Sequence, residues 1–274
     1  MRLTALFQYF AGFYPIIVPL TMLVAIGCLL LAAPDDEASE PERIEVLFLG
    51  SENRSNHDPP TRFRVLRKAL GPKAINITYA HTVDALTAEN LAQFDVLLIF
   101  ANLYTIDKET QGKALLDFAR NGGGCVLLHC AAGCFRDSQF DGYVDLLGAQ
   151  FKSHTTGVFR AQIVNEEHPV MKGWPGFECW DETYEHKRHG KDRLILQKRD
   201  EEPWTWVKTY GKGRVFYTAS GHDHRCWNLT EYQDLVHRAI RWTAHDDSTR
   251  WLAPEDLPEL RPPQRRARRG RQVH

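Results

Sequence analysis

The sequence of 274 residues lacks the short motifs that mark most local metal, redox and nucleotide sites. It has no HExxH motif and no CxxC pair with zinc-finger spacing, so no local sequence motif indicates a zinc site, and no GxGxxG follows its first predicted strand, which weakens the case for a dinucleotide site. Six cysteines in a chain of this length do not make a disulfide framework. No internal repeat is visible. The composition, 43% hydrophobic and 11% aromatic, is that of a globular protein with a core.

Charges of one sign are concentrated near each end of the chain, acidic after residue 33 and basic after residue 260, although the formal net charge is only −1. Residues 10–33 carry no charge, residues 34–45 hold six acids against one arginine, and residues 261–274 hold six arginines and no acid. Without those six arginines, 28 basic residues face 35 acidic ones, a net charge of −7. An acidic body of this kind argues against nucleic-acid binding.

The first 33 residues have the pattern of a membrane-directed segment. Residues 16–33 form an apolar run of 18 residues, which is the lower limit for crossing a bilayer. The pattern predicts either a cleaved signal peptide or a membrane anchor over residues 1–33, followed by an acidic linker over 34–42. We therefore expect an exported or membrane-anchored, extracytoplasmic protein that associates with the membrane through residues 10–33.

The middle of the chain, residues 43–246, alternates predicted strands and helices and is expected to form one domain. Its strands are nearly continuous apolar runs, which suits a parallel sheet buried on both faces. The alternation predicts a doubly wound α/β fold with right-handed crossovers. Predicted strands cover 44–49, 75–79, 95–100, 125–128, 158–164, 194–197, 204–208 and 214–219, and the longer predicted helices cover 60–70, 107–120 and 230–243. The proline- and arginine-rich tail, residues 247–274, is expected to be disordered.

Several polar residues stand where predicted strands end. In open α/β sheets ligands bind outside the carboxyl ends of the strands, so these residues are the candidates for a site. They are His129 after strand 125–128, His154 in the polar loop 152–157, Asp181, Glu182 and Tyr184 in the extended segment 180–186, and His222 and Asp223 after strand 214–219.

The candidate residues suit two kinds of chemistry. Three histidines, His129, His154 and His222, could hold a divalent metal together with an acid from segment 180–186, if the strand ends converge. A histidine oriented by an acid is also a general base, and a carboxylate beside a tyrosine can bind a polyol. The structural alternatives are a core histidine, a solvated loop and a charged edge strand.

The order of these segments resembles the ThuA-like (trehalose utilisation) family over residues 43–246. The matching pieces are Gly50 with the loop to His57, Asn121–Gly124 before the strand ending at His129, His154, His168-Pro169-Val170, Asp181–Tyr184, Gly213–Thr218 with Gly221-His222-Asp223, and Trp227 with the helix to Trp242. Each motif alone is weak, whereas their order over 200 residues is more specific.

The resemblance implies a class I glutamine amidotransferase-like fold, a flavodoxin-like three-layer α/β sandwich with a mostly parallel central sheet. In that superfamily a cysteine nucleophile occupies the sharp turn after the strand that corresponds to residues 125–128. Here His129 holds that position and Cys130 follows it, while Leu127 stands where a glycine is usual. Glutaminase chemistry is therefore not expected.

The resemblance also implies a role in the utilisation of trehalose, a related disaccharide or a keto-sugar, with a small sugar as the partner. In this interpretation the site residues divide into three groups. His129, His222, Asp223 and Glu182 are catalytic; His154, Tyr184, Asp181 and Trp227 bind substrate; and His129, His154 and His222 hold the divalent metal. Two alternatives remain open, a non-catalytic carbohydrate-binding or regulatory module and a Cys130-dependent amidase or hydrolase.

Overall fold

The computed structural model describes residues 42–52 and 57–245. The segments expected to be a signal peptide or anchor and a disordered tail lie outside the described residues, as does nearly all of the acidic linker. Within residues 42–52 and 57–245, no helix has the length and apolar character needed to cross a bilayer.

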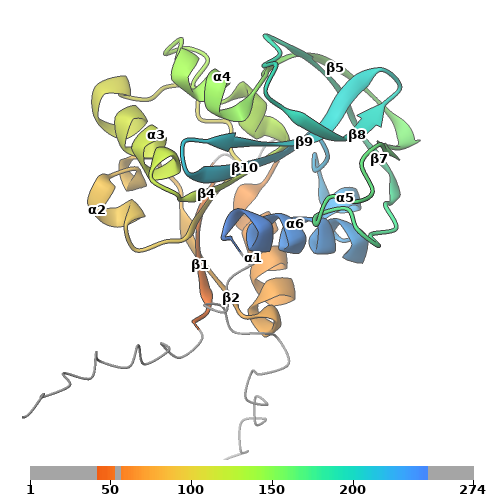
Figure 1. Ribbon diagram of the computed structural model, residues 1–274, viewed down its shortest axis with the longest axis horizontal. Coiled ribbons are helices and arrows are strands. Elements are labelled where there is room, and N and C mark those ends of the chain that lie inside the picture. Colours follow the sequence, from red (N-terminus) through yellow and green to blue (C-terminus); the bar gives the residue numbers. More distant parts are fainter. Residues whose placement is uncertain (1–41, 53–56, 246–274) are drawn as a thin grey trace, which may run out of the picture. The chain divides into compact units, whose positions relative to one another are not determined.

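An eight-stranded sheet forms the centre of the domain, and a two-stranded antiparallel ribbon lies beside it (Figure 1). Five strands run parallel and the remaining three extend the sheet in antiparallel pairs, so the expected mostly parallel flavodoxin-like sheet is confirmed. In spatial order the sheet contains β2 (Ile75–Ala80), β1 (Ile44–Leu49), β3 (Val96–Ile99), β4 (Gly124–Leu128), β10 (Gly213–Thr218), β9 (Glu202–Tyr210), β8 (Leu194–Arg199) and β6 (Gln162–Ile163). The ribbon pairs β5 (Gln150–Arg160) with β7 (Glu178–Lys187).

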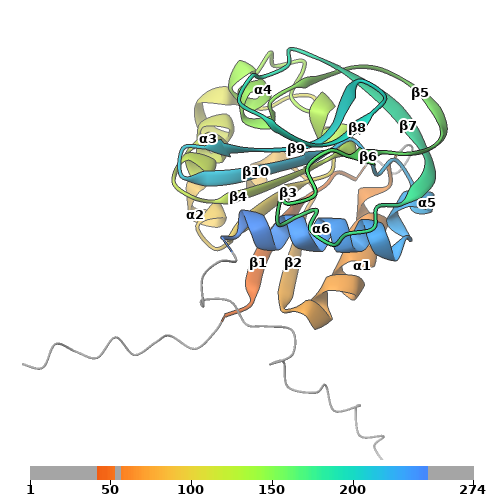
Figure 2. The same ribbon diagram turned by 45° about the vertical axis from the view of Figure 1, so that its right-hand side comes forward.

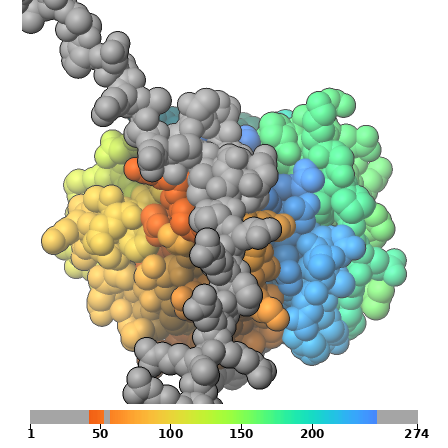
Figure 3. All heavy atoms as spheres, turned by 90° about the horizontal axis from the view of Figure 1, so that it is seen from below, coloured from red at the N-terminus to blue at the C-terminus, as the bar shows by residue number. Residues whose placement is uncertain are grey.

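Helices cover both faces of the sheet, because alternate side chains of each strand point to opposite sides. In β1, Val46 and Phe48 pack under one set of helices, and Leu47 and Leu49 pack under the other. The first set is α1 (Pro59–Leu70), α5 (His224–Trp227) and α6 (Thr230–Thr243); the second is α2 (Ala88–Leu91), α3 (Lys113–Arg120) and α4 (Asp141–Leu147). Figure 2 shows the two sets on opposite sides of the sheet, and Figure 3 shows the orange α1 region beside the blue C-terminal helix.

Local signals in the sequence place several helices correctly. Two prolines open α1, where a missing N–H costs nothing, and the Thr87 hydroxyl accepts a hydrogen bond from Asn90 N at the start of α2. The predicted helix over 230–243 matches α6. The predicted helix over 107–120 is not uniform, because its first part, Lys108–Gly112, is a wider π-helical turn in which Gly112 N–H donates to Asp107 O.

The expectation of a polar loop over residues 152–157 is wrong, since these residues lie inside β5. Their side chains are exposed on the ribbon, and His154 pairs with Tyr184 of β7. A strand that is solvated over this stretch carries no alternation of apolar and polar residues, so the usual sequence signal for a strand is missing. The pairing brings His154 to the same end of the sheet as His129.

Gly213, at the start of β10, sits where a side chain has no room. A Cβ atom there would lie 2.3 Å from Ala119 O and 2.5 Å from Gly123 O, both backbone atoms. We expect Gly213→Ala to lower the free energy of unfolding by about 1–3 kcal/mol, measured by denaturant titration. Gly71→Ala is the matched control, because nothing lies within 4 Å of the place that its added Cβ atom would take. Equal denaturation midpoints for the Gly213 variant and the wild type would contradict this prediction.

Candidate functional site

His129 stands at the carboxyl end of β4, where the chain turns sharply. Its φ of 45° is in the left-handed region, and a single turn of 3₁₀ helix, His129–Gly133, follows it. Small residues in that turn let the backbone fold tightly, as the sequence predicts. A non-glycine residue held at positive φ is strained, and such residues are concentrated at functional sites.

The His129 ring is fully buried and held from both sides. Nδ1 lies 2.6 Å from Ala219 O, and because a carbonyl oxygen only accepts, Nδ1 carries the proton. In the neutral ring the other nitrogen, Nε2, therefore carries a lone pair. This lone pair points toward Glu182 Oε2, and the distance from Nε2 to Oε2 is 3.1 Å. A lone pair facing a carboxylate needs either a proton or a cation between them.

The Glu182 carboxylate, on β7, is approached by two further histidines. Oε1 lies 3.2 Å from His222 Nδ1 and 3.6 Å from His154 Nδ1. Burial opposes ionisation of Glu182, but the interactions with His129 and His222 outweigh it and lower the pKa of the carboxyl well below its usual range. Burial likewise opposes the charge on His222, yet Glu182 raises its pKa overall. The site thus contains an ionised carboxylate among imidazoles.

His57, in the loop after β1, completes the group. Its ring centroid lies 5.1 Å from those of both His129 and His222. Burial, followed by the like charges of the other histidines, lowers the pKa of His57 to about 3, so the ring is neutral at physiological pH. Nδ1 lies 2.9 Å from the Asn102 side-chain amide, while the buried Nε2 has no hydrogen-bond partner among the described residues.

Four residues from separate parts of the chain therefore present ligand atoms to one point. One atom each from His57, His129, Glu182 and His222 lies within 4.8 Å of all the others. Three imidazoles and one carboxylate suit Zn²⁺ or another first-row transition ion better than Mg²⁺ or Ca²⁺. Ala219 O and Asn102 already orient two of the rings, as partners of metal-ligating histidines do.

His222 Nδ1 fits the role of a ligand better than that of a hydrogen-bond donor. Although it lies 3.2 Å from Glu182 Oε1, the buried atom makes no contact of hydrogen-bond geometry with the described part of the chain. An unsatisfied buried polar atom is costly, and a bound cation would satisfy it. The chemistry of this group of four therefore fits a metal ion.

Of the three histidines predicted as metal ligands, the structure brings His129 and His222 together with Glu182 but leaves His154 out. His154 is outside the group of four; its side chain is 39% exposed and lies at the edge of the site. His57 takes its place. It was not among the candidate ligands because it follows β1 after several loop residues, although its position beyond a strand end was a usable signal.

Asp181 is a positioning residue in the structure. Its fully buried carboxylate accepts hydrogen bonds from Gly221 N at 2.8 Å, His222 N at 3.1 Å and Glu182 N at 2.9 Å. Burial raises its pKa, against the effect of these hydrogen bonds and of His129. Asp181 therefore holds the two neighbouring ligands, Glu182 and His222, instead of facing a substrate.

Asp223 does not serve as the acid that orients His222. Its carboxylate accepts a hydrogen bond from Arg225 N at 2.9 Å, which caps α5, and forms an ion pair with the Arg225 guanidinium. Burial opposes its ionisation, but the Arg225 interactions prevail and lower the pKa of Asp223. Its role in the structure is to shape the turn that carries His222.

The two aromatic residues predicted to bind substrate, Tyr184 and Trp227, lie in different environments. Tyr184 stacks on His129, with ring centroids 4.2 Å apart, and faces the site. Trp227 is fully buried, donates from its indole N–H to Gly221 O at 2.7 Å and packs on Phe100. The expectation that Trp227 binds substrate is therefore wrong, because its ring belongs to the core.

A pocket of about 400 Å³ borders three of the four candidate ligands, His57, Glu182 and His222, while the fully buried His129 lies behind its wall. Aromatic and hydrogen-bonding side chains line it together. They are His57, Asn102, Tyr104, Cys130, Gly133, Arg136, Phe151, His154, Glu182, Tyr184 and His222. The Arg136 guanidinium lies over the Tyr104 ring, 4.1 Å from its centroid, at the wall. The volume and lining suit a small polar molecule.

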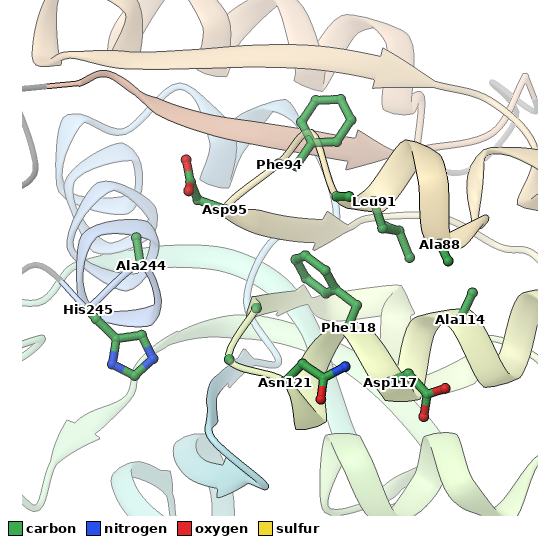
Figure 4. Close-up of a pocket in the computed structure, with 13 residues that line it drawn as sticks. Ala88, Leu91, Phe94, Asp95, Ala114, Asp117, Phe118, Asn121, Ala244 and His245 are labelled. Carbon is green, nitrogen blue, oxygen red and sulfur yellow. The ribbon is translucent and has the colours of Figure 1, made fainter. Parts of the chain in front are cut away.

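A larger pocket, of about 510 Å³, lies at the other end of the parallel strands, beside their amino ends (Figure 4). Asp95 and Asn121 on its wall precede β3 and β4, so it is at the amino ends of the strands. Its lining is mainly apolar, with Phe94 and Phe118 facing it from the segments around α2 and α3. None of the four candidate ligands borders it, whereas three of them line the smaller pocket.

Comparison with protein families identifies the domain. The family model ThuA, described as trehalose utilisation, matches residues 45–243. The chain belongs to the ThuA family. The match covers β1 through α6, so all four candidate metal ligands lie within the ThuA domain.

Solved structures of ThuA-like proteins share this fold. One from Parabacteroides merdae has a TM-score of 0.65 at 20% identity, covering 77% of this chain and 93% of that one. Another, from Bacteroides uniformis, has a TM-score of 0.64 at 19% identity, covering 81% and 98%. A β-galactosidase from Rahnella sp. R3 matches over 33% of its own length, with a TM-score of 0.54, 15% identity and 80% of this chain covered. No curated protein matches the sequence.

Proposed function

We propose that this ThuA-family protein binds a first-row transition ion through His57, His129, Glu182 and His222 and acts on a disaccharide or keto-sugar in the adjoining pocket. The observation that carries the proposal is the convergence of these four side chains within 4.8 Å at the carboxyl edge of the sheet. The family description, trehalose utilisation, supports a sugar as the ligand.

The pocket residues supply what a sugar needs around such an ion. A metal ion would act as a Lewis acid on a hydroxyl or carbonyl oxygen. The His154 imidazole, beside Glu182 and partly exposed, is placed to exchange a proton with the substrate. Asn102 and Arg136 offer hydrogen bonds to hydroxyl groups, and the Phe151 ring offers an apolar face to a pyranose ring.

The cysteine-dependent alternative has weak support. Cys130 borders the pocket, but it is only 2% exposed, and burial raises the pKa of its thiol well above the usual range. A nucleophilic cysteine needs the thiolate, which an apolar environment disfavours. His129, at the sharp turn, occupies the position where the superfamily resemblance would place the nucleophile.

Metal dependence of sugar binding and turnover tests the proposal. The full chain is stripped with a chelator, reloaded with Zn²⁺, Mn²⁺ or Co²⁺, and titrated by calorimetry with trehalose, related disaccharides and their keto derivatives, with product analysis by mass spectrometry. We expect turnover only in the reloaded protein, and His154→Ala to lower it about 10²–10⁴-fold with metal content unchanged. Lys152→Ala, on the same strand and exposed, is the control.

The outcome distinguishes a sugar-processing enzyme from a sugar-binding module. Sugar binding without product in every metal form would identify a binding module, the non-catalytic alternative. Turnover by the metal-free protein, or no sugar binding in any form, would contradict the proposed function.

A further inference from the structure

Two cysteines lie together beside Asp181, the residue that positions two of the candidate metal ligands. Cys179 is on β7 and Cys226 is on α5. Their sulfur atoms and a carboxylate oxygen of Asp181 all lie within 4.8 Å of one another. Both are free thiols; Cys226 is fully buried and Cys179 is partly exposed.

The residues next to the two cysteines in the sequence hold β7 and α5 together. The guanidinium of Arg225 lies over the Trp180 ring, 3.5 Å from its centroid. Arg225 and Trp180 are the sequence neighbours of Cys226 and Cys179, so this stacking fixes β7 and α5 side by side at the thiols. A disulfide would require the sulfur atoms to close from within 4.8 Å to about 2.0 Å by side-chain rotation and small shifts.

We propose that Cys179 and Cys226 form a reversible disulfide by exchange with a low-molecular-weight disulfide. The Cys179 thiolate attacks one sulfur of the reagent, forms a mixed disulfide and releases one thiol. Cys226 then attacks the Cys179 sulfur and releases the second thiol, so the protein loses two hydrogens and two electrons, and the reagent is reduced to two thiols. The partial exposure of Cys179 suits the attacking role. Burial raises the pKa of the Cys226 thiol well above its usual range, so Cys226 does not react with the reagent directly and gives up its proton only to attack the mixed disulfide beside it.

The disulfide would restrict the movement of the segment that carries two of the candidate ligands, Glu182 and His222. The chain between Cys179 and Cys226 contains Glu182 and His222. The Asp181 carboxylate accepts hydrogen bonds from the backbone N–H groups of both residues. A covalent link between β7 and α5 would therefore restrict the turn that presents His222. The export expected from residues 1–33 would place the pair in an oxidising compartment.

Peptide mapping of the oxidised wild-type protein tests the proposal without sugar or metal. The full chain is incubated with glutathione disulfide in the presence of a chelator, free thiols are alkylated, and the digest is analysed by mass spectrometry. We expect the major product to link the peptides that contain Cys179 and Cys226, and dithiothreitol to reverse the link. Cys125, Cys130 and Cys134, all buried, are the internal controls and should be alkylated only after unfolding.

A variant and a competing product make the outcome decisive. Cys179→Ser should abolish the link and leave Cys226 unmodified, because the other cysteines of the described residues are all buried and cannot make the first attack on the reagent. A stable mixed disulfide at Cys179 with Cys226 free, or no oxidation at either residue, would overturn the proposal. Neither result bears on the metal or sugar site, so the two proposals fail independently.

Discussion

Glu182→Gln is expected to weaken transition-metal binding by more than about 100-fold. The substitution keeps the shape of the side chain but removes the only negative charge among the four ligands, and a neutral amide is a poor ligand beside three imidazoles. Losing a residue that only orients a ligand already costs about 10- to 100-fold in affinity, so losing the charged ligand itself should cost more. Competition with a chelator of known affinity, followed by metal analysis, measures the change.

The control lies on the same strand. Glu185→Gln removes an exposed carboxylate that pairs with Lys152, and metal affinity should not change. The histidines give a second comparison, because His57 belongs to the group of four and His154 does not. His57→Ala should lose metal as Glu182→Gln does, whereas His154→Ala should keep it. Retention of wild-type affinity by Glu182→Gln would refute the assigned ligand set.

Trp227→Ala is expected to lower the free energy of unfolding by about 3–5 kcal/mol, the usual cost of truncating a buried aromatic side chain. The ring is fully buried between Phe100 and Tyr232, with centroids 4.7 Å and 5.2 Å away. Its removal leaves a cavity and also leaves Gly221 O without the indole donor. Denaturant titration followed by fluorescence or circular dichroism measures the loss.

Trp180→Ala is the matched control, since this tryptophan is only partly buried and lies under Arg225 on the ribbon. It should cost markedly less stability than Trp227→Ala. A Trp227→Ala protein as stable as the wild type but with weaker sugar binding would show instead that the ring is a sugar platform. That result would restore the role that sequence reasoning assigned to Trp227.

Periodicity and strand-end position predicted the framework of this protein with little error. Helix α6 follows from apolar residues at helical spacing, and β1, β3 and β4 follow from short apolar runs buried on both faces. The sharp turn at His129 follows from the small residues after a buried strand. These elements were predictable because their patterns depend on neighbours within a few residues.

Other features needed information that a linear pattern does not contain. Strand β5 is solvated over much of its length, and α4 is a short helix that was not predicted. The sequence pattern does not assign His57 and Trp227 to core or site. His57 lies in a loop, and Trp227 lies in a strongly apolar environment. Their positions depend on contacts with residues far away in the sequence.

The sequence by itself determined the α/β class, the mostly parallel sheet, the ThuA resemblance and the edge of the sheet where the candidate site residues gather. It also supplies the expectations for residues 1–33 and 247–274. Only the tertiary structure decided that His57, and not His154, joins His129, Glu182 and His222, because the four side chains converge only when the middle of β7 is brought against the segments that follow β1, β4 and β10. The same packing decided that Asp181 positions ligands and that Trp227 fills the core, since burial and hydrogen-bond partners are properties of the folded chain.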